Sequence, residues 1–352
     1  MSRNVSVKRE PPRRLPASHW ARLPDEELLR LRFCDLELSM ERAPIKRMIA
    51  RLYRELESRG IHFKPHLWFS EEWFSPDGVP GIAVPFYLAH PRLERLERRI
   101  MREAEGGNSR WLMRILRHEA GHALDNAYRL RRRKRWRQVF GPASLKYPAH
   151  YKARPGSRRY VHHLGEWYAQ SHPTEDFAET FAVWLKPRSA WRKSYADWPA
   201  VQKLEVVEEL LAEVRDRAPP VRNRLRIEPV EDDRRTLAEH YRRKLARNRQ
   251  CRRGMSDELL QRVFARQRTA RQGMRAARLL RGHRGSLVTS VARSLRLPRY
   301  TVQQILRMLI ERSDSMKLYV RGNRRDALRH ARWMLERLVS MYAEGETPQL
   351  PL

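Results

Sequence analysis

Residues 111–125 read Trp-Leu-Met-Arg-Ile-Leu-Arg-His-Glu-Ala-Gly-His-Ala-Leu-Asp. Apolar residues recur at helical spacing before the pentapeptide 118–122, which predicts an amphipathic helix from about residue 109 to 136. His118 and His122 are four residues apart, so both imidazoles lie on one helix face and can reach one zinc ion. Glu119 falls beside that ion, where a bound water would sit. The spacing predicts a zinc-activated water with Glu119 as its general base.

A second stretch, residues 168–185, reads Tyr-Ala-Gln-Ser-His-Pro-Thr-Glu-Asp-Phe-Ala-Glu-Thr-Phe-Ala-Val-Trp-Leu. Pro173 suits the first turn of a helix, and large apolar residues follow at helical spacing. Because a catalytic zinc usually takes three protein ligands, we expect Glu175 to be the third. Glu179 lies one turn further on the same face. We expect it to accept a hydrogen bond from the far nitrogen of a ligand histidine.

Together the two stretches resemble the zincin metallopeptidases of the glutamate-ligand (gluzincin) type. The second stretch is similar to the helix that carries the third ligand in the lethal-factor catalytic domain, and both resemble bacterial putative zinc-binding metallopeptidases. The resemblance implies one Zn²⁺ per chain and a role for each of six residues: His118, His122 and Glu175 as metal ligands, Glu119 as general base, Glu179 as hydrogen-bond partner of a ligand, and Tyr168 as a donor to the developing oxyanion.

Other residues near the two stretches compete for the place of third ligand. Asp176 is less favoured, because it points about 100° around the helix from Glu175. A histidine ligand would instead suggest the histidine-ligand zincins, such as the DNA-linked SprT-like proteases. The candidates are His150, His162, His163 and His172, of which His172 is the best placed although Pro173 puts it at a helix entry.

The pattern along the chain predicts an α+β fold that is mostly helical. We expect a basic tail over residues 1–20 and a zincin-like metallopeptidase domain over residues 21–218. Short apolar runs at 66–69 and 81–87 predict two strands of a small antiparallel sheet in that domain. After Pro219-Pro220 the character changes, and residues 221–352 predict an all-α basic C-terminal region.

Helical patterns recur in the C-terminal region near 234–250, 255–281, 286–296, 300–312 and 323–342. Residues 286–312 resemble a helix-turn-helix, although Arg296 stands where glycine is common in the turn. Two packed helices that never contact DNA give the same pattern. Both a DNA-reading segment and a helical accessory domain therefore stay open.

Composition narrows the classes of protein. The chain has 352 residues, is 41% hydrophobic and contains 10 Trp, so it is not a disordered polymer. No apolar run approaches the ~20 residues of a transmembrane segment, and the N-terminus lacks the apolar centre of a signal peptide. Cys34 and Cys251 are predicted to be free thiols. We therefore expect a cytoplasmic protein.

The net charge of +33 has two possible explanations. An arginine-rich composition can come from a GC-rich genome, or it can attract an anionic partner such as nucleic acid to the C-terminal region. The leading hypothesis is a zinc metalloendopeptidase that hydrolyses peptide or protein substrates. The alternatives are a nucleic-acid-binding or regulatory protein with a non-catalytic zincin-like domain, and a DNA-associated protease.

Overall fold

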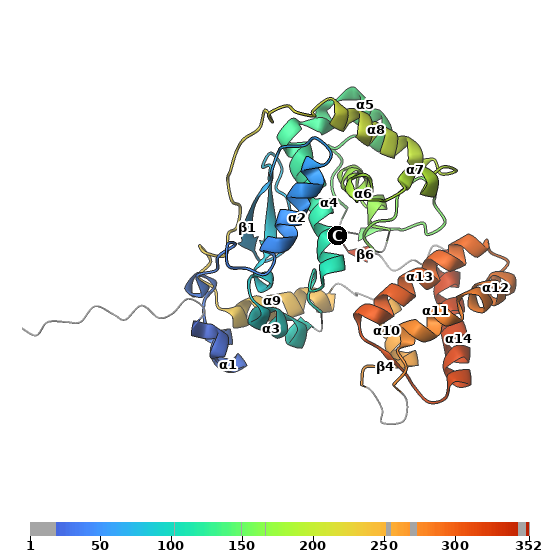
Figure 1. Ribbon diagram of the computed structural model, residues 1–352. Coiled ribbons are helices and arrows are strands. Elements are labelled where there is room, and N and C mark those ends of the chain that lie inside the picture. Colours follow the sequence, from blue (N-terminus) through green and yellow to red (C-terminus); the bar gives the residue numbers. More distant parts are fainter. Residues whose placement is uncertain are drawn as a thin grey trace, which may run out of the picture.

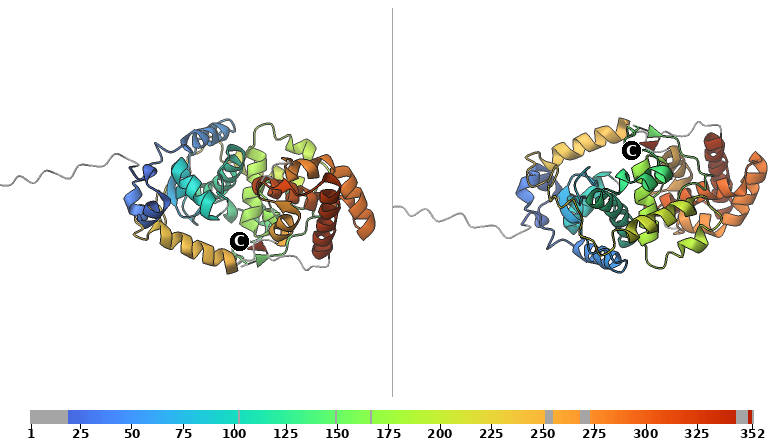
Figure 2. Two further views of the ribbon diagram at one scale, coloured as in Figure 1. Left: turned by 90° about the horizontal axis from the view of Figure 1, so that it is seen from below. Right: turned by 90° about the horizontal axis from the view of Figure 1, so that it is seen from above.

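The computed structural model describes residues 19–101, 103–148, 150–165, 167–250, 255–267, 273–343 and 350–351. Residues 1–18 of the expected tail and Cys251 lie outside this part of the chain. In all three views of Figures 1 and 2, the first helices of the chain lie at one end of the molecule and the last helices lie at the other end. None of the described helices combines the length and apolar character that a membrane crossing requires.

Helices dominate, as the sequence predicts. The α-helices are α1 (Asp25–Arg30), α2 (Lys46–Glu57), α3 (Pro91–Met101), α4 (Ser109–Tyr128), α5 (Lys134–Phe140), α6 (Pro173–Leu185), α7 (Trp191–Ser194), α8 (Ala200–Ala212), α9 (Leu237–Gln250), α10 (Met255–Val263), α11 (Ala276–Gly282), α12 (Arg284–Leu295), α13 (Arg299–Ser315) and α14 (Arg324–Ala343). Short 3-10 helices are η1 (His19–Arg22), η2 (Phe33–Leu36), η3 (Phe86–Ala89), η4 (Leu130–Arg132) and η5 (Tyr168–Gln170). The strands are β1 (His66–Ser70), β2 (Gly81–Pro85), β3 (His150–Tyr151), β4 (Phe264–Ala265), β5 (Tyr319–Val320) and β6 (Leu350–Pro351).

The two longest strands pair in parallel, so the expected antiparallel sheet is wrong. β1 and β2 run side by side from His66 opposite Gly81 to Ser70 opposite Pro85. The reason is the path of the connection, residues 71–80. It passes from β1 to the far edge of β2 instead of forming a hairpin. Within it, Phe74 makes an antiparallel bridge to Ala83 on the other edge of β2. β2 is therefore flanked on both edges, and all its residues are buried.

The motif helix α4 is shorter than predicted. It ends at Tyr128 instead of continuing to residue 136, and Arg129 takes the left-handed conformation with φ 54°. Beyond the break, Arg131 folds back onto the buried Asp125 carboxylate, which accepts hydrogen bonds from its backbone N (2.7 Å) and its side-chain Nε. This ion pair offsets the cost of a non-glycine residue in the left-handed region.

The first of two large hydrophobic clusters surrounds α4 and extends beyond the expected domain boundary at residues 218–221. It includes Val230, and also Leu237 and Tyr241 of α9. The chain before α9 runs along β1, where Trp68 donates from its indole Nε1 to the carbonyl oxygen of Ile227 at 2.9 Å. Residues 221–241 thus pack with the elements that carry the motif.

The second cluster belongs to the C-terminal helices α10–α14 and also contains Tyr151, Ala153 and Trp167. This region is not purely α-helical, because β4 and β5 form a two-residue antiparallel pair. The helix predicted over 255–281 is interrupted there, since α10 ends at Val263. The helix-turn-helix-like segment forms α12 and α13, with Arg296 left-handed (φ 52°) in the turn where glycine is common.

Candidate metal centre

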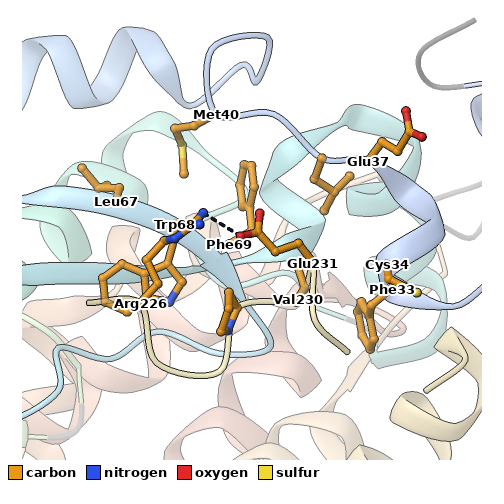
Figure 3. A pocket seen from close by; sticks show the side chains of 12 residues that line it. Phe33, Cys34, Glu37, Met40, Leu67, Trp68, Phe69, Arg226, Val230 and Glu231 are labelled. Atoms are coloured by element: carbon orange, nitrogen blue, oxygen red, sulfur yellow. Dashed lines mark ion pairs between the residues drawn. The ribbon is translucent and has the colours of Figure 1, made fainter. Parts of the chain in front are cut away.

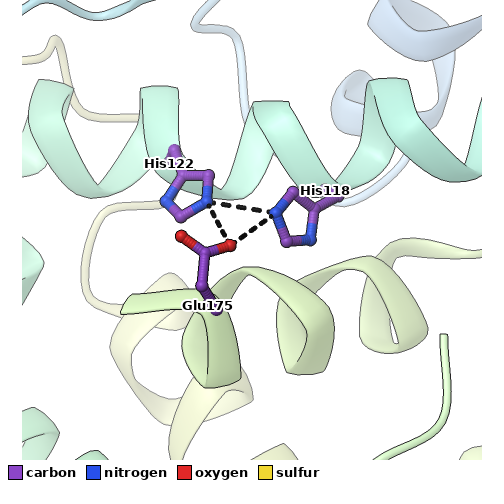
Figure 4. Close-up of side chains that lie close together, drawn as sticks. All are labelled: His118, His122 and Glu175. Carbon is purple, nitrogen blue, oxygen red and sulfur yellow. Dashed lines mark hydrogen bonds and ion pairs between the residues drawn. The ribbon is translucent and has the colours of Figure 1, made fainter. Parts of the chain in front are cut away.

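Helices α4 and α6 pack closely and bring the two sequence motifs together (Figure 4). Gly121 of α4 faces α6. A Cβ on Gly121 would lie 3.0 Å from the Cα of Ala178 and 3.0 Å from the Cδ1 of Phe181. A glycine in mid-helix costs about 1 kcal/mol relative to alanine, and the lack of a side chain here lets the two helices meet.

Three potential ligand atoms converge between the helices. His118 Nε2 lies 2.9 Å from Glu175 Oε2, and His122 Nε2 lies 3.2 Å from the same oxygen. The two Nε2 atoms are 3.1 Å apart. All three residues are at least 90% buried. Among the described residues, this is the group that could hold a metal ion.

Glu179 lies behind the ligand cluster, on the outer side of His118. Its Oε1 accepts a hydrogen bond from His118 Nδ1 at 3.0 Å, and its Oε2 accepts one from the backbone N of Leu164 at 2.8 Å. Because a carboxylate only accepts, His118 carries its proton on Nδ1 when neutral and presents the lone pair of Nε2 to the cluster.

The cluster needs a positive charge. With the His118 proton on Nδ1, His118 Nε2 and the Glu175 carboxylate would otherwise face each other as acceptors. Burial by itself would lower the pKa of His118, but hydrogen bonds to Glu175 and Glu179 raise that pKa well above its ordinary value. Burial would raise the pKa of Glu175, but the neighbouring His122 and His118 hold it well below its usual range. A shared cation satisfies all three atoms.

Glu119 lies at the side of the cluster, on α4. Its Oε2 accepts a hydrogen bond from Ser75 Oγ at 3.1 Å, and the same hydroxyl is 3.3 Å from the Glu119 carbonyl oxygen. Ser75 belongs to the connection between β1 and β2. Its hydrogen bond therefore joins this connection to the motif helix at the Glu119 carboxylate. No pattern in the sequence marks Ser75 as a residue of this site.

Tyr168 lies beside His118. The two rings are 5.6 Å apart between centroids. Burial, with the nearby carboxylates Glu175 and Glu119, raises the pKa of the Tyr168 phenol well above its ordinary value, so it stays an O–H donor at neutral pH. The structure thus places Tyr168 beside the cluster.

Tyr147 is a residue of the site that the sequence analysis missed. Its hydroxyl donates to Glu175 Oε1 at 2.7 Å, the oxygen that faces away from the histidines. It also contacts the hydroxyl of Thr174. Its ring stacks on His172, with centroids 3.8 Å apart and an interplanar angle of 17°. Nothing in the local sequence marks it, because it lies in an irregular segment with no periodic pattern.

None of the alternative ligands whose side chains the structure describes lies in the cluster. His172 caps α6, where its side chain accepts from the backbone N of Thr174. His163 hydrogen-bonds the carbonyl oxygen of Arg114 at 2.9 Å, and His162 faces Trp198. Asp176 forms an ion pair with Lys203, and burial raises its pKa to about 7. The side chain of His150 lies outside the described part of the structure.

A separate pocket of about 270 Å³ lies against β1 (Figure 3). Its walls include Leu67, Phe69 and Val230, and an ion pair of 2.7 Å joins Arg226 and Glu231 beside it. None of the cluster residues lines it. We assign it no function.

Comparison with known proteins agrees with this geometry. A family described as "putative zinc-binding metallo-peptidase" matches residues 91–209, about a third of the chain. No curated protein and no solved structure matches. The similarity offers no support for a nucleic-acid partner. The matched segment contains both α4 and α6, so the family similarity and the buried donor cluster together support a zinc-binding peptidase.

Proposed function

We propose that this chain is a zinc metalloendopeptidase of the gluzincin type, with one zinc held by His118, His122 and Glu175. The observation that carries the proposal is the convergence of their three donor atoms from two helices. Two imidazole nitrogens and one carboxylate oxygen are a ligand set typical of catalytic zinc sites, which keep a further position open. Glu179 supports the set by fixing the ring of His118.

Zinc bound there would supply a Lewis acid and lower the pKa of a water molecule. Glu119 accepts the proton of the attacking water and passes it to the leaving amine. The hydrogen bond from Ser75 to Oε2 restrains the Glu119 carboxylate, and we assign the proton transfer to its other oxygen, Oε1. A restrained base loses less freedom in reaching the reactive geometry.

Tyr168 donates its O–H to the substrate carbonyl oxygen as negative charge develops there. Its raised pKa keeps it protonated, which this role requires. Tyr147 has a different task. By holding Oε1 of Glu175 at 2.7 Å, it directs Oε2 toward the histidines. Tyr147 is therefore a positioning residue for the third ligand.

The test is Glu119→Gln in the full chain, assayed with zinc on an unfolded protein such as casein. We expect the variant to keep its zinc and to lose at least about a hundredfold in the production of internal fragments. Glu205→Gln, an exposed change on α8, is the matched control and should behave as wild type. A Glu119→Gln variant that cleaves at the wild-type rate would refute the proposed mechanism.

A further inference from the structure

Tyr168 lies at the junction between the metal centre and the C-terminal helices. On one side its ring is 5.6 Å from that of His118. On the other it packs against the second hydrophobic cluster, to which the preceding residue, Trp167, belongs. The ring of Tyr151, also in that cluster, is 6.4 Å from the Tyr168 ring. Tyr168 therefore contacts both the α4–α6 site and the core of α10–α14.

The backbone at Trp167 is in a conformation that needs support. Its φ is 57°, in the left-handed region that a bulky residue seldom adopts. Such a conformation persists only where the surroundings hold it in place. Here the Trp167 side chain is 6% exposed and meets Tyr342 of α14, with ring centroids 5.5 Å apart and an interplanar angle of 70°.

Further contacts tie the C-terminal helices to the rest of the chain. Arg312 of α13 forms ion pairs with Glu103, just after α3, at 2.6 Å and with Asp257 of α10 at 2.7 Å. At the start of α13, Tyr300 packs edge-on against Trp198, with centroids 5.8 Å apart. The guanidinium of Arg158 lies 4.9 Å from the centre of the Tyr300 ring.

These contacts bear on the helix-turn-helix resemblance. A DNA-reading segment presents the first residues of its second helix to the bases. In this chain Tyr300 is packed against Trp198 and Arg158, and a Cβ on Gly156 would lie 2.8 Å from Thr301 Oγ1. The start of α13 is thus engaged within the chain.

We propose that the C-terminal helices contribute to the metal centre by positioning one of its residues. They contact Trp167, and through Trp167 they hold Tyr168 beside His118. The catalytic consequence rests on the proposed function, but the positional coupling does not. Trp167 and Tyr342 are positioning residues that act through Tyr168. A partner that bound α14 or displaced it would change activity at the metal centre without touching a ligand.

Hydrogen exchange of the full-length protein tests the coupling without an activity assay. Three amide hydrogen bonds define η5: Tyr168 N to Gly165 O, Gln170 N to Trp167 O and Ser171 N to Tyr168 O, at 3.2, 2.9 and 3.0 Å. Trp167→Ala, and separately Tyr342→Leu, should speed exchange of these amides at least about tenfold. Amides of α4 and α6 should keep wild-type rates, which excludes general unfolding.

Trp333→Ala is the matched control, because Trp333 is also on α14 but its side chain is 50% exposed. It should leave η5 exchange unchanged. If Trp167→Ala and Tyr342→Leu leave the η5 amides as protected as in wild type, the coupling is refuted. If both variants speed exchange in α4 and α6 equally, the helices support the whole fold and not Tyr168 in particular, which also overturns the proposal.

A double-mutant cycle links the coupling to catalysis. Tyr168→Phe should lower kcat about a hundredfold or more, as expected for a lost oxyanion donor. Trp167→Ala should lower kcat at least about tenfold in the wild-type background, with less effect on KM, yet change little in the Tyr168→Phe background. Equal losses in both backgrounds would contradict action through Tyr168. Zinc content measured on the same variants tests the proposed function separately.

Discussion

Gly121→Ala tests whether the close packing of α4 on α6 builds the site. Alanine in mid-helix gains about 1 kcal/mol over glycine from helix propensity. The added methyl would lie 3.0 Å from the Cα of Ala178, which is backbone and cannot turn aside, and 3.0 Å from Phe181. Overpacking of this kind costs about 1–3 kcal/mol. We expect a net loss of about 1 kcal/mol in unfolding free energy, and weaker zinc binding as the helices separate.

The matched control is Gly285→Ala in α12, where nothing lies within 4 Å of the added methyl. There the alanine only reduces the freedom of the unfolded chain, and stability should rise by about 0.4–1 kcal/mol. Urea unfolding followed by circular dichroism measures both variants. The reasoning fails if Gly121→Ala stabilises the protein as much as Gly285→Ala does.

Two further changes test individual side chains. Tyr147→Phe removes the hydrogen bond to Glu175 and should weaken zinc binding about 10- to 100-fold. Competition with a chelator measures the affinity for zinc. An unchanged affinity would exclude a positioning role for Tyr147. Hydrogen bonds with His240 and Arg235 lower the pKa of Glu71 from 4.5 to about 2. This carboxylate therefore stabilises the fold above pH 4.5, and the contribution is lost as the pH falls toward 2. Glu71→Gln should lower stability at neutral pH and flatten the acid dependence of urea unfolding; a wild-type acid dependence would contradict this reading.

The parts of the site that lie on helices could be predicted because helical periodicity is local. Residues four apart share a face, so the pairs His118–His122 and Glu175–Glu179 follow from spacing alone. The first and last residues of α6 could also be predicted from the sequence. Pro173 begins it, and the apolar pattern ends with it at Leu185.

The parts formed by irregular segments could not be predicted. Ser75 and Tyr147 reach the site from loops, where neither a period nor a turn signal says which way a side chain points. The end of α4 carries no glycine or proline, because an ion pair between the buried Asp125 and the partly exposed Arg131 stabilises the left-handed Arg129 instead. Strand direction also depended on the path of residues 71–80, which reach the far edge of β2, and the sequence pattern does not show that path.

The packing of the residues after Pro219-Pro220 illustrates the same limit. Pro219-Pro220 marks a change in composition, yet Val230, Leu237 and Tyr241 lie in the first hydrophobic cluster. The two prolines predict where a helix ends. They do not predict which hydrophobic cluster the following residues join.

Metal analysis of the purified full-length chain tests the central claim most directly, using Glu175→Ala and His172→Ala side by side. We predict about one zinc per chain in the wild type and in His172→Ala, and loss of zinc in Glu175→Ala, because Glu175 Oε2 faces both Nε2 atoms while His172 caps α6. Full zinc in Glu175→Ala together with its loss in His172→Ala would contradict this assignment of the metal centre.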